Sequence, residues 1–489
     1  MLFSSLAYLV FLPVVALLYF LLPKPVKNPM LLAASYYFYM NWNAAFALLL
    51  LAATGVTYAG GLLIGRAKTG KGKRGILAAC LVLNLGVLYF FKYWNFTTEG
   101  IRTLADALFA MKLADGRLNI LLPVGISFFT FQVVGYLIDV YRGKTVPERN
   151  IITYALFVAF FPQLLSGPIA RSTQLLPQFR ETNRFDFDRM RSGLLLMGWG
   201  FFKKLVIADR LSVVANTVFA DVRKYDGVEL LVAMVCFSFQ IYCDFSAYTD
   251  IARGSARILG FSLMQNFQSP YLSRNIREFW QRWHISLSSW FRDYLYIPLG
   301  GSRKGLARKY VNLLVVFLVS GLWHGAAMTF VVWGLLNGLY QMIGEITLPV
   351  RDRMLRVAGI DRQSACHQGM QVLVTFLLAM TAWVFFRAAT LPDALYVASH
   401  MWVPDLWKWT DGSLLRLGLD LPELVLGMAS AIGVIAVEGV TQRRKNLVAV
   451  LVAQPLVYRW AAYLCLLFAV LVLGRYGMFA EQSFLYFQF

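Results

Sequence analysis

Charge is scarce in this sequence. Asp, Glu, Lys and Arg account for 15% of the 489 residues, whereas an average soluble domain has about 25%. Negative charge is the scarcer sign, because 26 Asp and Glu stand against 46 Lys and Arg and leave a formal net charge of +20. With 58% hydrophobic residues, the composition excludes an ordinary soluble domain and a disordered chain, and it favours a membrane protein.

Cysteine and histidine are also few. The five cysteines lie mostly in apolar runs and form no CxxC pair, which indicates buried, inert thiols and no disulfide framework. The four histidines are not spaced as metal ligands, and the motifs HExxH and GxSxG are absent, so no metal ion is expected. The stretch GRAKTGKG at 65–72 has Gly72 where a phosphate-binding loop needs Ser or Thr, so it is interpreted as a basic turn.

Apolar runs recur along the whole chain, and a helix needs about 20 such residues to cross a bilayer. The candidates are residues 2–22, 30–64, 76–93, 120–140, 151–167, 192–207, 230–245, 311–342, 372–386, 424–440 and 461–473. No alternating strand pattern competes with them, and unpaired backbone is not tolerated in lipid. The sequence predicts an all-α polytopic membrane protein with about 10–14 transmembrane helices, forming one integral-membrane domain over residues 1–489.

Lys and Arg gather in short segments between these runs. The clusters are residues 24–27, 66–74, 142–149, 303–309 and 442–445. Because cytoplasmic loops are enriched in Lys and Arg, the positive charge is interpreted as a topology signal and not as a nucleic-acid site. Counting crossings from the first two clusters predicts an N-terminus on the outer, periplasmic side. Residues 171–191 and 271–301 are amphipathic and predict re-entrant or interfacial helices.

One apolar run carries an unusual polar face. Gln240, Asp244 and Tyr248 are spaced i, i+4 and i+8, so they share one face of a helix. A carboxylate inside a membrane helix is costly and faces a bundle interior or a wet cavity. Two interpretations are open: a hydrogen-bond network that joins helices, or a cavity wall that orients substrate or a catalytic group.

A second polar stretch, residues 273–305, is aromatic and basic. On a helical wheel its Trp and Phe residues share one arc, and His284 lies at the edge of that arc, which is typical of a helix at the membrane interface. The following IPLGGSRKG predicts a flexible basic turn near the interface. Arg292, Arg303 and Lys304 are therefore candidates for binding a phosphorylated donor such as coenzyme A.

The third stretch, GLWHGAAMTFVVWGLLNGLY at 321–340, places His324 inside an apolar run. Ser320 and Gly321 lie on the turn that His324 covers, and they allow either a close neighbouring helix or room for substrate. Burial favours a neutral imidazole, which is the form that a general base needs. Trp323 and Asn337 are further candidates for the cavity wall.

These stretches carry a resemblance to a known family. The two histidine segments, FWQRWHISLSSWFRDYLYIPLGGSR and LWHGAAMTFVVWGLLNG, resemble those of the membrane-bound O-acyltransferases. GISFFTFQVVGYLIDVYRG (125–143), FPQLLSGPIAR (161–171) and FQIYCDFSAYTDIARG (239–254) are similar to the bacterial branch of that family, in the same order. The resemblance covers roughly the whole chain, and it most resembles members of that branch that O-acetylate alginate in the bacterial inner membrane.

The resemblance implies a fold around a central tunnel, with a catalytic region at residues 120–345. It implies transfer of an acetyl group from a cytoplasmic acyl thioester, acetyl-CoA, to a hydroxyl, with His324 as general base and His284 assisting on the donor side. It further implies hand-over to an extracytoplasmic acetyltransferase partner that modifies the polysaccharide. Neither a resident cofactor nor a metal ion is implied.

Other functions fit the same motifs. Related members acetylate cellulose or peptidoglycan, or transfer D-alanine to teichoic acid. A transporter or flippase of a polysaccharide precursor is the alternative from another class, because buried polar residues also mark translocation paths; no inverted internal repeat supports it. A non-catalytic membrane scaffold is a further alternative.

Overall fold

The computed structural model describes residues 1–444, 447–476 and 484. All regular structure in these residues is helical, without a strand, which confirms the predicted all-α class. The chain packs as two compact units. Unit 1 comprises residues 1–194 and 251–264, and unit 2 comprises residues 195–250 and 265–489. The two units are defined by packing alone, so the predicted single functional domain over residues 1–489 stays a prediction.

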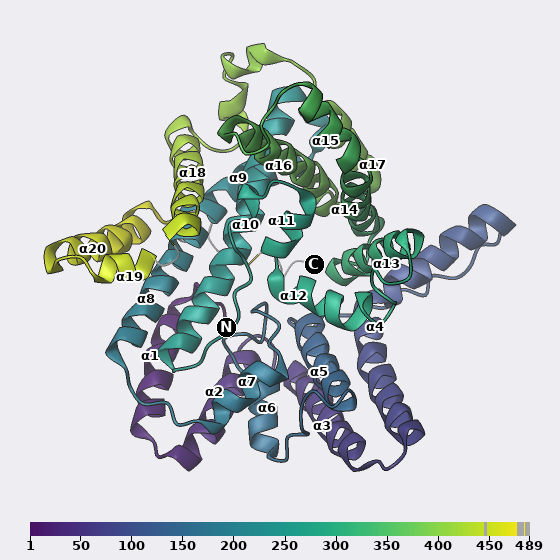
Figure 1. Cartoon of the computed structure of the whole chain (residues 1–489), viewed down its shortest axis with the longest axis vertical. Coiled ribbons are helices and arrows are strands. Elements are labelled where there is room, and N and C mark those ends of the chain that lie inside the picture. The colour runs from purple at the N-terminus through teal and green to yellow at the C-terminus, as the bar shows by residue number, and fades with distance from the viewer. Residues whose placement is uncertain (445–446, 477–483, 485–489) are drawn as a thin grey trace. The chain divides into compact units, whose positions relative to one another are not determined.

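Unit 1 contains the N-terminal helices. They are α1 (Leu6–Leu21), α2 (Lys24–Met40), α3 (Ala45–Arg66), α4 (Gly70–Phe109), α5 (Ile126–Tyr141), α6 (Ile151–Ala159), α7 (Ser172–Arg180) and the first half of α8 (Phe187–Phe201). Helices α3, α4 and α5 lie side by side (Figure 1). A Cβ at Gly60 would lie 2.5 Å from the Cys80 sulfur, and one at Gly61 would lie 2.8 Å from the Tyr136 hydroxyl. The two glycines therefore allow α3 to approach both neighbours closely.

Unit 2 begins in α8 and continues through a π-helix, η1 (Phe202–Ala208), into α9 (Asp209–Ala220) and α10 (Gly227–Ile258), whose last turns belong to unit 1. The short element η2 (Val222–Lys224) lies between α9 and α10. Four short elements follow α10: η3 (Pro270–Leu272), α11 (Ile276–Arg282), α12 (Ile285–Phe291) and the π-helix η4 (Arg292–Tyr296). The remaining elements are α13 (Leu306–His324), α14 (Met328–Ile346), α15 (Leu348–Val357), α16 (Ala365–Arg387), α17 (Leu391–His400), η5 (Leu406–Trp409), η6 (Ser413–Arg416), α18 (Leu421–Arg444), α19 (Leu447–Val452) and α20 (Leu456–Leu473).

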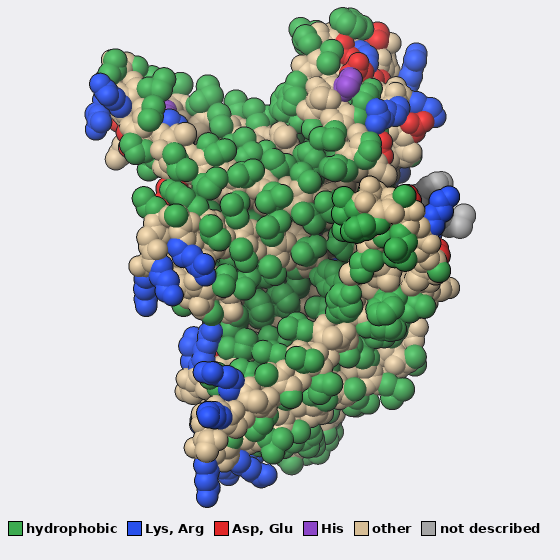
Figure 2. All heavy atoms as spheres, turned by 90° about the vertical axis from the view of Figure 1, so that its right-hand side faces the viewer, with side chains coloured by type: hydrophobic (Ala, Val, Ile, Leu, Met, Phe, Trp, Pro, Cys, Tyr) green, Lys and Arg blue, Asp and Glu red, His purple; other side chains and the backbone are tan. Residues whose placement is uncertain are grey.

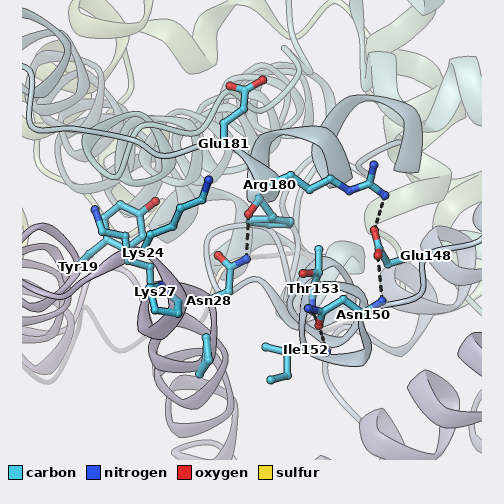
Figure 3. A pocket seen from close by; sticks show the side chains of 13 residues that line it. Tyr19, Lys24, Lys27, Asn28, Glu148, Asn150, Ile152, Thr153, Arg180 and Glu181 are labelled. Atoms are coloured by element: carbon cyan, nitrogen blue, oxygen red, sulfur yellow. Dashed lines mark hydrogen bonds and ion pairs between the residues drawn. The ribbon is translucent and has the colours of Figure 1, made fainter.

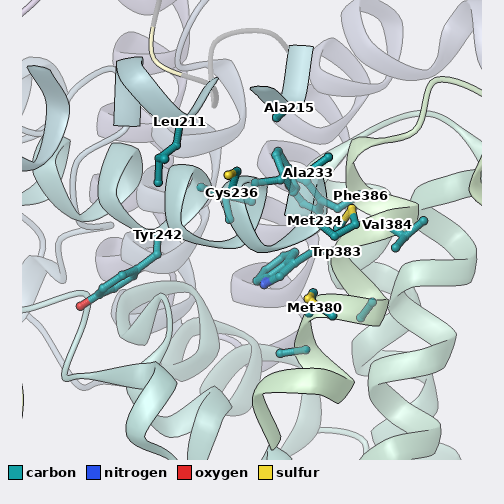
Figure 4. Close-up of a cluster of buried hydrophobic side chains, with 14 of the residues drawn as sticks. Leu211, Ala215, Ala233, Met234, Cys236, Tyr242, Met380, Trp383, Val384 and Phe386 are labelled. Carbon is teal, nitrogen blue, oxygen red and sulfur yellow. The ribbon is translucent and has the colours of Figure 1, made fainter. Parts of the chain in front are cut away.

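Aromatic and sulfur-containing side chains fill the core of unit 2. Figure 4 shows Met234 of α10 near Met380 and Trp383 of α16. The Trp383 ring lies 4.9 Å from the Trp283 ring and 5.9 Å from the Trp333 ring, centroid to centroid. The first pair is tilted, with 45° between the ring planes, and the second is stacked, with 22°. Rigid aromatic side chains bury a large area, so they hold the short helices α11 and α12 against long ones.

Seven described helices are long and apolar enough to cross a membrane: α3, α4, α10, α13, α16, α18 and α20. Two shorter apolar helices, α1 and α5, accompany them. Figure 2 shows hydrophobic side chains over most of one face of the molecule, and Lys and Arg side chains mainly toward its edges. The protein is thus a multi-pass membrane protein. The number of long helices is below the predicted range because some apolar runs are not continuous helices; the run at 151–167, for example, is helical only to Ala159.

Candidate active site

His324 is the last residue of α13, and the chain turns there into α14. The two helices form a tight antiparallel pair, seen in Figure 1. A Cβ at Gly321 would lie 2.2 Å from the Phe330 carbonyl oxygen, and one at Gly334 would lie 2.4 Å from the Phe317 carbonyl oxygen. The prediction that Gly321 leaves room for substrate is therefore wrong, because α14 occupies that space. Of the two predicted alternatives, close helix packing is the one observed.

Three aromatic rings surround the His324 imidazole. Trp323 and Trp333 lie 5.0 Å from it and Phe386 lies 5.3 Å from it, centroid to centroid, all edge to face. Only 5% of the His324 side chain is exposed. The walls come from three helices, α13, α14 and α16, so the ring orientation is fixed by packing on several sides. This surrounding is apolar, as the sequence predicted for a neutral imidazole.

His284 lies between α11 and α12 in a left-handed conformation, with φ of 44°. Such a conformation is costly for a residue with a Cβ and marks a strained position. Asn266 holds the strained turn: its backbone carbonyl accepts from the Ile285 N–H at 2.9 Å, and its side-chain oxygen accepts from the Ser286 N–H at 3.0 Å. The continuous helical wheel over 273–305 is therefore wrong, because the chain bends at His284.

His284 is fully buried. Its ring lies 4.7 Å from the Phe245 ring and 6.0 Å from the Trp323 ring. It lies outside the seven apolar helices, and burial lowers its pKa to about 3, so its imidazole is neutral at physiological pH. Trp323 contacts both histidines, so the structure brings the two predicted catalytic residues together around one indole.

The predicted polar face of α10 is present and buried. Gln240, Asp244 and Tyr248 are each at most 5% exposed. The Lys204 ammonium lies 2.7 Å from one Asp244 oxygen and 2.9 Å from one Asp209 oxygen, so Asp244 belongs to a buried ion-pair cluster. The ring of Phe484 packs 4.9 Å from the Tyr248 ring. The polar face of α10 was interpreted either as a network that joins helices or as a cavity wall. The ion pairs agree with the network.

Two remaining cavity candidates have packing partners in the same unit. Asn337 accepts a hydrogen bond from Trp280 Nε1 at 3.1 Å and donates to the Trp333 carbonyl oxygen at 2.8 Å. It thus joins α11 to α14. Ser320 is buried on α13 next to Gly321.

The three donor-binding candidates lie on the surface of unit 2. Arg292 starts the π-helix η4, is 64% exposed in its side chain and pairs with Asp293 at 2.9 Å. Arg303 and Lys304 are exposed in the turn before α13. Asn312 fixes this turn, because its amide donates to the carbonyl oxygens of Leu299 and Gly301 at 3.3 Å and 3.0 Å. The predicted basic turn is therefore present at the end of α13 opposite to His324.

The buried lysines of η1, Lys203 and Lys204, were not predicted as site residues. Besides the Lys204 cluster, the Lys203 ammonium lies 2.7 Å from Asp250 and 2.8 Å from the Ser246 hydroxyl. Tyr242 of α10 hydrogen-bonds to Glu438 of α18. The signal that was available is the pair of adjacent lysines inside the apolar run 192–207, since ionisable residues at such positions have a buried partner.

Comparison with known proteins places these features in one family. The sequence model of the MBOAT, membrane-bound O-acyltransferase, family matches residues 146–389, which include both histidines and the α10 face. The chain belongs to this family and is a multi-pass membrane O-acyltransferase that acts with an acyl donor in a lipid bilayer.

Two of the relatives described here cover most of the chain, and a third covers less than half of it. The chain is 39% identical to the probable alginate O-acetylase AlgI of Pseudomonas putida over 431 residues, covering 87% of this chain and 85% of that protein. It is 35% identical to the peptidoglycan O-acetyltransferase of Helicobacter pylori, covering 80% of this chain and 77% of that protein. The teichoic acid D-alanyltransferase of Bacillus subtilis is similar at 27% identity over 45% of this chain and 58% of that protein.

Proposed function

We propose that this protein moves an acetyl group from a cytoplasmic thioester donor across the bacterial inner membrane for O-acetylation of an exopolysaccharide, with alginate as the first candidate. The observation that carries the proposal is the buried pair of histidines around Trp323 in a family of O-acyltransferases. The similarity to an alginate O-acetylase over 87% of the chain supports the choice of acyl group and polymer.

His324 acts as the general base in this proposal. Its neutral imidazole takes the proton of the acceptor hydroxyl as the oxygen attacks the thioester carbonyl carbon. The carbon–sulfur bond then breaks, and the thiolate takes up the proton that His324 received. The neutral His284 donates a hydrogen bond that polarises the carbonyl, since burial keeps it from carrying a proton to the thiolate. No metal ion or resident cofactor takes part.

The acyl donor enters from the cytoplasm. Arg292, Arg303 and Lys304 supply positive charge for the phosphates of acetyl-CoA at the basic turn before α13. His324 stands at the other end of that helix, about 27 Å away at 1.5 Å per residue. The acetyl group therefore passes through a central tunnel, and the catalytic region is residues 120–345.

The acceptor side lies in the periplasm, with the N-terminus of the chain on the same side. An extracytoplasmic acetyltransferase partner receives the acetyl group and modifies the polymer. The lipid bilayer surrounds the apolar helices, and nucleic acid is not a partner.

The direct test is acetyl transfer from radiolabelled acetyl-CoA by the purified full chain in detergent. We expect hydrolysis or transfer by the wild type, and a loss of about 10²–10⁴-fold in His324→Ala. His367→Ala is the matched control, since His367 is a half-buried histidine on α16 outside the proposed site. Full acetylation by His324→Ala, at normal protein level, would overturn the proposal.

Peptidoglycan is the second candidate acceptor, because a peptidoglycan O-acetyltransferase is similar over 80% of the chain. Cellulose and the D-alanylation of teichoic acid are weaker alternatives. These candidate acceptors are distinguished by isolating each polymer from cells that express the protein and measuring its acetyl content. Acetyl gain in peptidoglycan and none in alginate would change the acceptor while leaving the acyltransfer chemistry intact.

A further inference from the structure

A polar cavity lies within unit 1. It has a volume of about 470 Å³ and is bordered by the end of α1, the first turn of α2, the start of α6 and the end of α7. Figure 3 shows Tyr19, Lys24 and Lys27 on one side of it and Glu148 and Asn150 on the other. None of the proposed acyltransfer residues lines this cavity.

Positive charge accumulates at the α2 border of the cavity. Lys24 and Lys27 occupy the first turn of α2, which has no acidic residue and no side-chain cap. Cations at this end of a helix oppose the helix dipole. An anion bound there would interact favourably with the dipole and with both lysines.

Lys27 is held in place although it is only 9% exposed. Its ammonium donates to the Asn183 carbonyl oxygen at 3.1 Å and lies 4.7 Å from the centre of the Tyr19 ring. Neither contact neutralises the charge, because a carbonyl and an aromatic ring carry no net charge. These two contacts therefore give the Lys27 ammonium no acidic partner.

The acidic residues of the cavity compensate its basic residues only in part. Glu148 accepts from Arg180 at 2.6 Å and from the N–H groups of Arg149 and Asn150 at 2.9 Å and 3.0 Å. The Glu181 carboxylate is turned away from Lys24 and Lys27 in Figure 3. The charged residues that line the cavity are Lys24, Lys27, Arg180, Glu148 and Glu181, so three cations stand against two carboxylates and the formal net charge of the lining is +1.

The rim of the cavity contains the exposed apolar side chain of Ile152. Val26 of α2 and Ile151 of α6, which adjoin lining residues in sequence, are also exposed. A ligand with a charged head and a hydrocarbon tail matches this combination, whereas a fully soluble anion gains nothing from the rim. The basic clusters at 24–27 and 142–149 belong to the side predicted to face the cytoplasm.

We propose that this cavity binds a phosphate group, namely the headgroup phosphate of an anionic phospholipid in the cytoplasmic leaflet. Lys24 and Lys27 hold the phosphate oxygens at the first turn of α2, and the acyl chains lie along the exposed apolar residues of the rim. The site is a lipid site of unit 1 and is independent of the acyltransfer chemistry.

The test uses the full chain in nanodiscs of phosphatidylcholine with increasing phosphatidylglycerol. The readouts are the Tm and the number of lipids retained in native mass spectrometry. Phosphatidylglycerol raises the Tm of the wild type, and Lys24→Gln and Lys27→Gln each weaken its apparent affinity about fivefold, the effect of one basic residue near an anionic surface. Lys68→Gln is the matched control, because Lys68 is an exposed lysine of the basic cluster 66–74 away from the cavity.

Lys24→Gln keeps the test valid if Lys27→Gln fails to fold, since Lys24 is exposed. If phosphatidylglycerol changes the Tm and the number of retained lipids equally in Lys24→Gln, Lys68→Gln and the wild type, the proposed lipid site is wrong. Glycerol phosphate without added lipid is the second arm. If it protects as well as the lipid does, the cavity binds a soluble phosphate and the assignment to a phospholipid is overturned.

Discussion

At the scale of single residues, His284 combines two costs. It adopts a left-handed backbone at φ of 44°, and it buries an imidazole completely among Phe245 and Trp323. Strain and burial of a titratable group persist only where the surroundings over-determine them, and such positions cluster at functional sites. This independent signal coincides with the residue that the motif comparison selected, which strengthens the assignment of His284 to the active site.

The lowered pKa of His284 gives stability a pH dependence. The folded protein has a pKa of about 3 there, against 6.5 for an ordinary histidine. Between these values the unfolded chain binds the proton and the folded protein does not, so the free energy of unfolding falls as pH falls below about 6.5. The slope contributed by this one residue is at most about 1.4 kcal/mol per pH unit.

His284→Gln removes this contribution. We expect its Tm to change less between pH 7.5 and pH 5 than the Tm of the wild type, measured in one detergent at constant ionic strength. His367→Gln serves as control and keeps the wild-type dependence. An identical pH dependence in all three proteins would show that His284 is protonated without cost.

At the scale of helices, the α13–α14 pair positions His324 through backbone proximity. Gly321 and Gly334 face the carbonyl oxygens of Phe330 and Phe317 across the pair. Because the pair is packed at this distance, the end of α13 and its imidazole have little freedom to shift. The precision of the site thus depends on residues that carry no chemistry.

Gly321→Ala tests this dependence. The added methyl group would lie 2.2 Å from the Phe330 carbonyl oxygen, so the helices must separate at a cost of roughly 1–3 kcal/mol. We expect a lower Tm and a lower rate of acyl transfer. Gly344→Ala on α14, where nothing lies within 4 Å, is the matched control and leaves stability unchanged or raised by about 0.5–1 kcal/mol. Equal Tm values for the two variants would contradict the packing argument.

The π-helix η1 delivers the buried Lys204 to two carboxylates on α9 and α10. Lys204→Met leaves Asp209 and Asp244 facing each other without that charge. Removing one partner of a buried ion pair costs roughly 3–5 kcal/mol, so we expect a large fall in Tm and in the yield of folded protein. Lys224→Met removes an exposed lysine that pairs with Asp221 and should change stability by less than about 0.5 kcal/mol. A Tm equal to that of the control would show that the cluster does not stabilise the fold.

At the scale of the whole molecule, features that depend on local pattern were predictable. The helical class, the polar face of α10 and the two histidines follow from composition, spacing and motif. Features that depend on a partner distant in sequence were not predictable. The contact of Gly321 with Phe330 depends on where α14 packs, and the bend at His284 depends on hydrogen bonds from Asn266. The Lys204 cluster joins three separate elements, and spacing within one helix contains no information about the other two.

The side of the membrane on which each loop lies follows from the same local signals, and it is directly testable. The basic turn containing Lys304 is expected in the cytoplasm, together with Lys68. The apolar run 311–342 is predicted to cross twice, as α13 and α14, and α16 is predicted to cross again, so we expect Arg416, between α17 and α18, in the periplasm. In a Cys366→Ser, Cys465→Ser background, which removes the two exposed cysteines of the described residues, a membrane-impermeant maleimide added to intact spheroplasts should label Arg416→Cys and spare Lys304→Cys and Lys68→Cys.

Permeabilised cells supply the control, since all three sites are exposed and should then react. Labelling of Lys304→Cys in intact spheroplasts would place the proposed donor site on the acceptor side, where acetyl-CoA is absent, and the proposed direction of transfer would have to be abandoned.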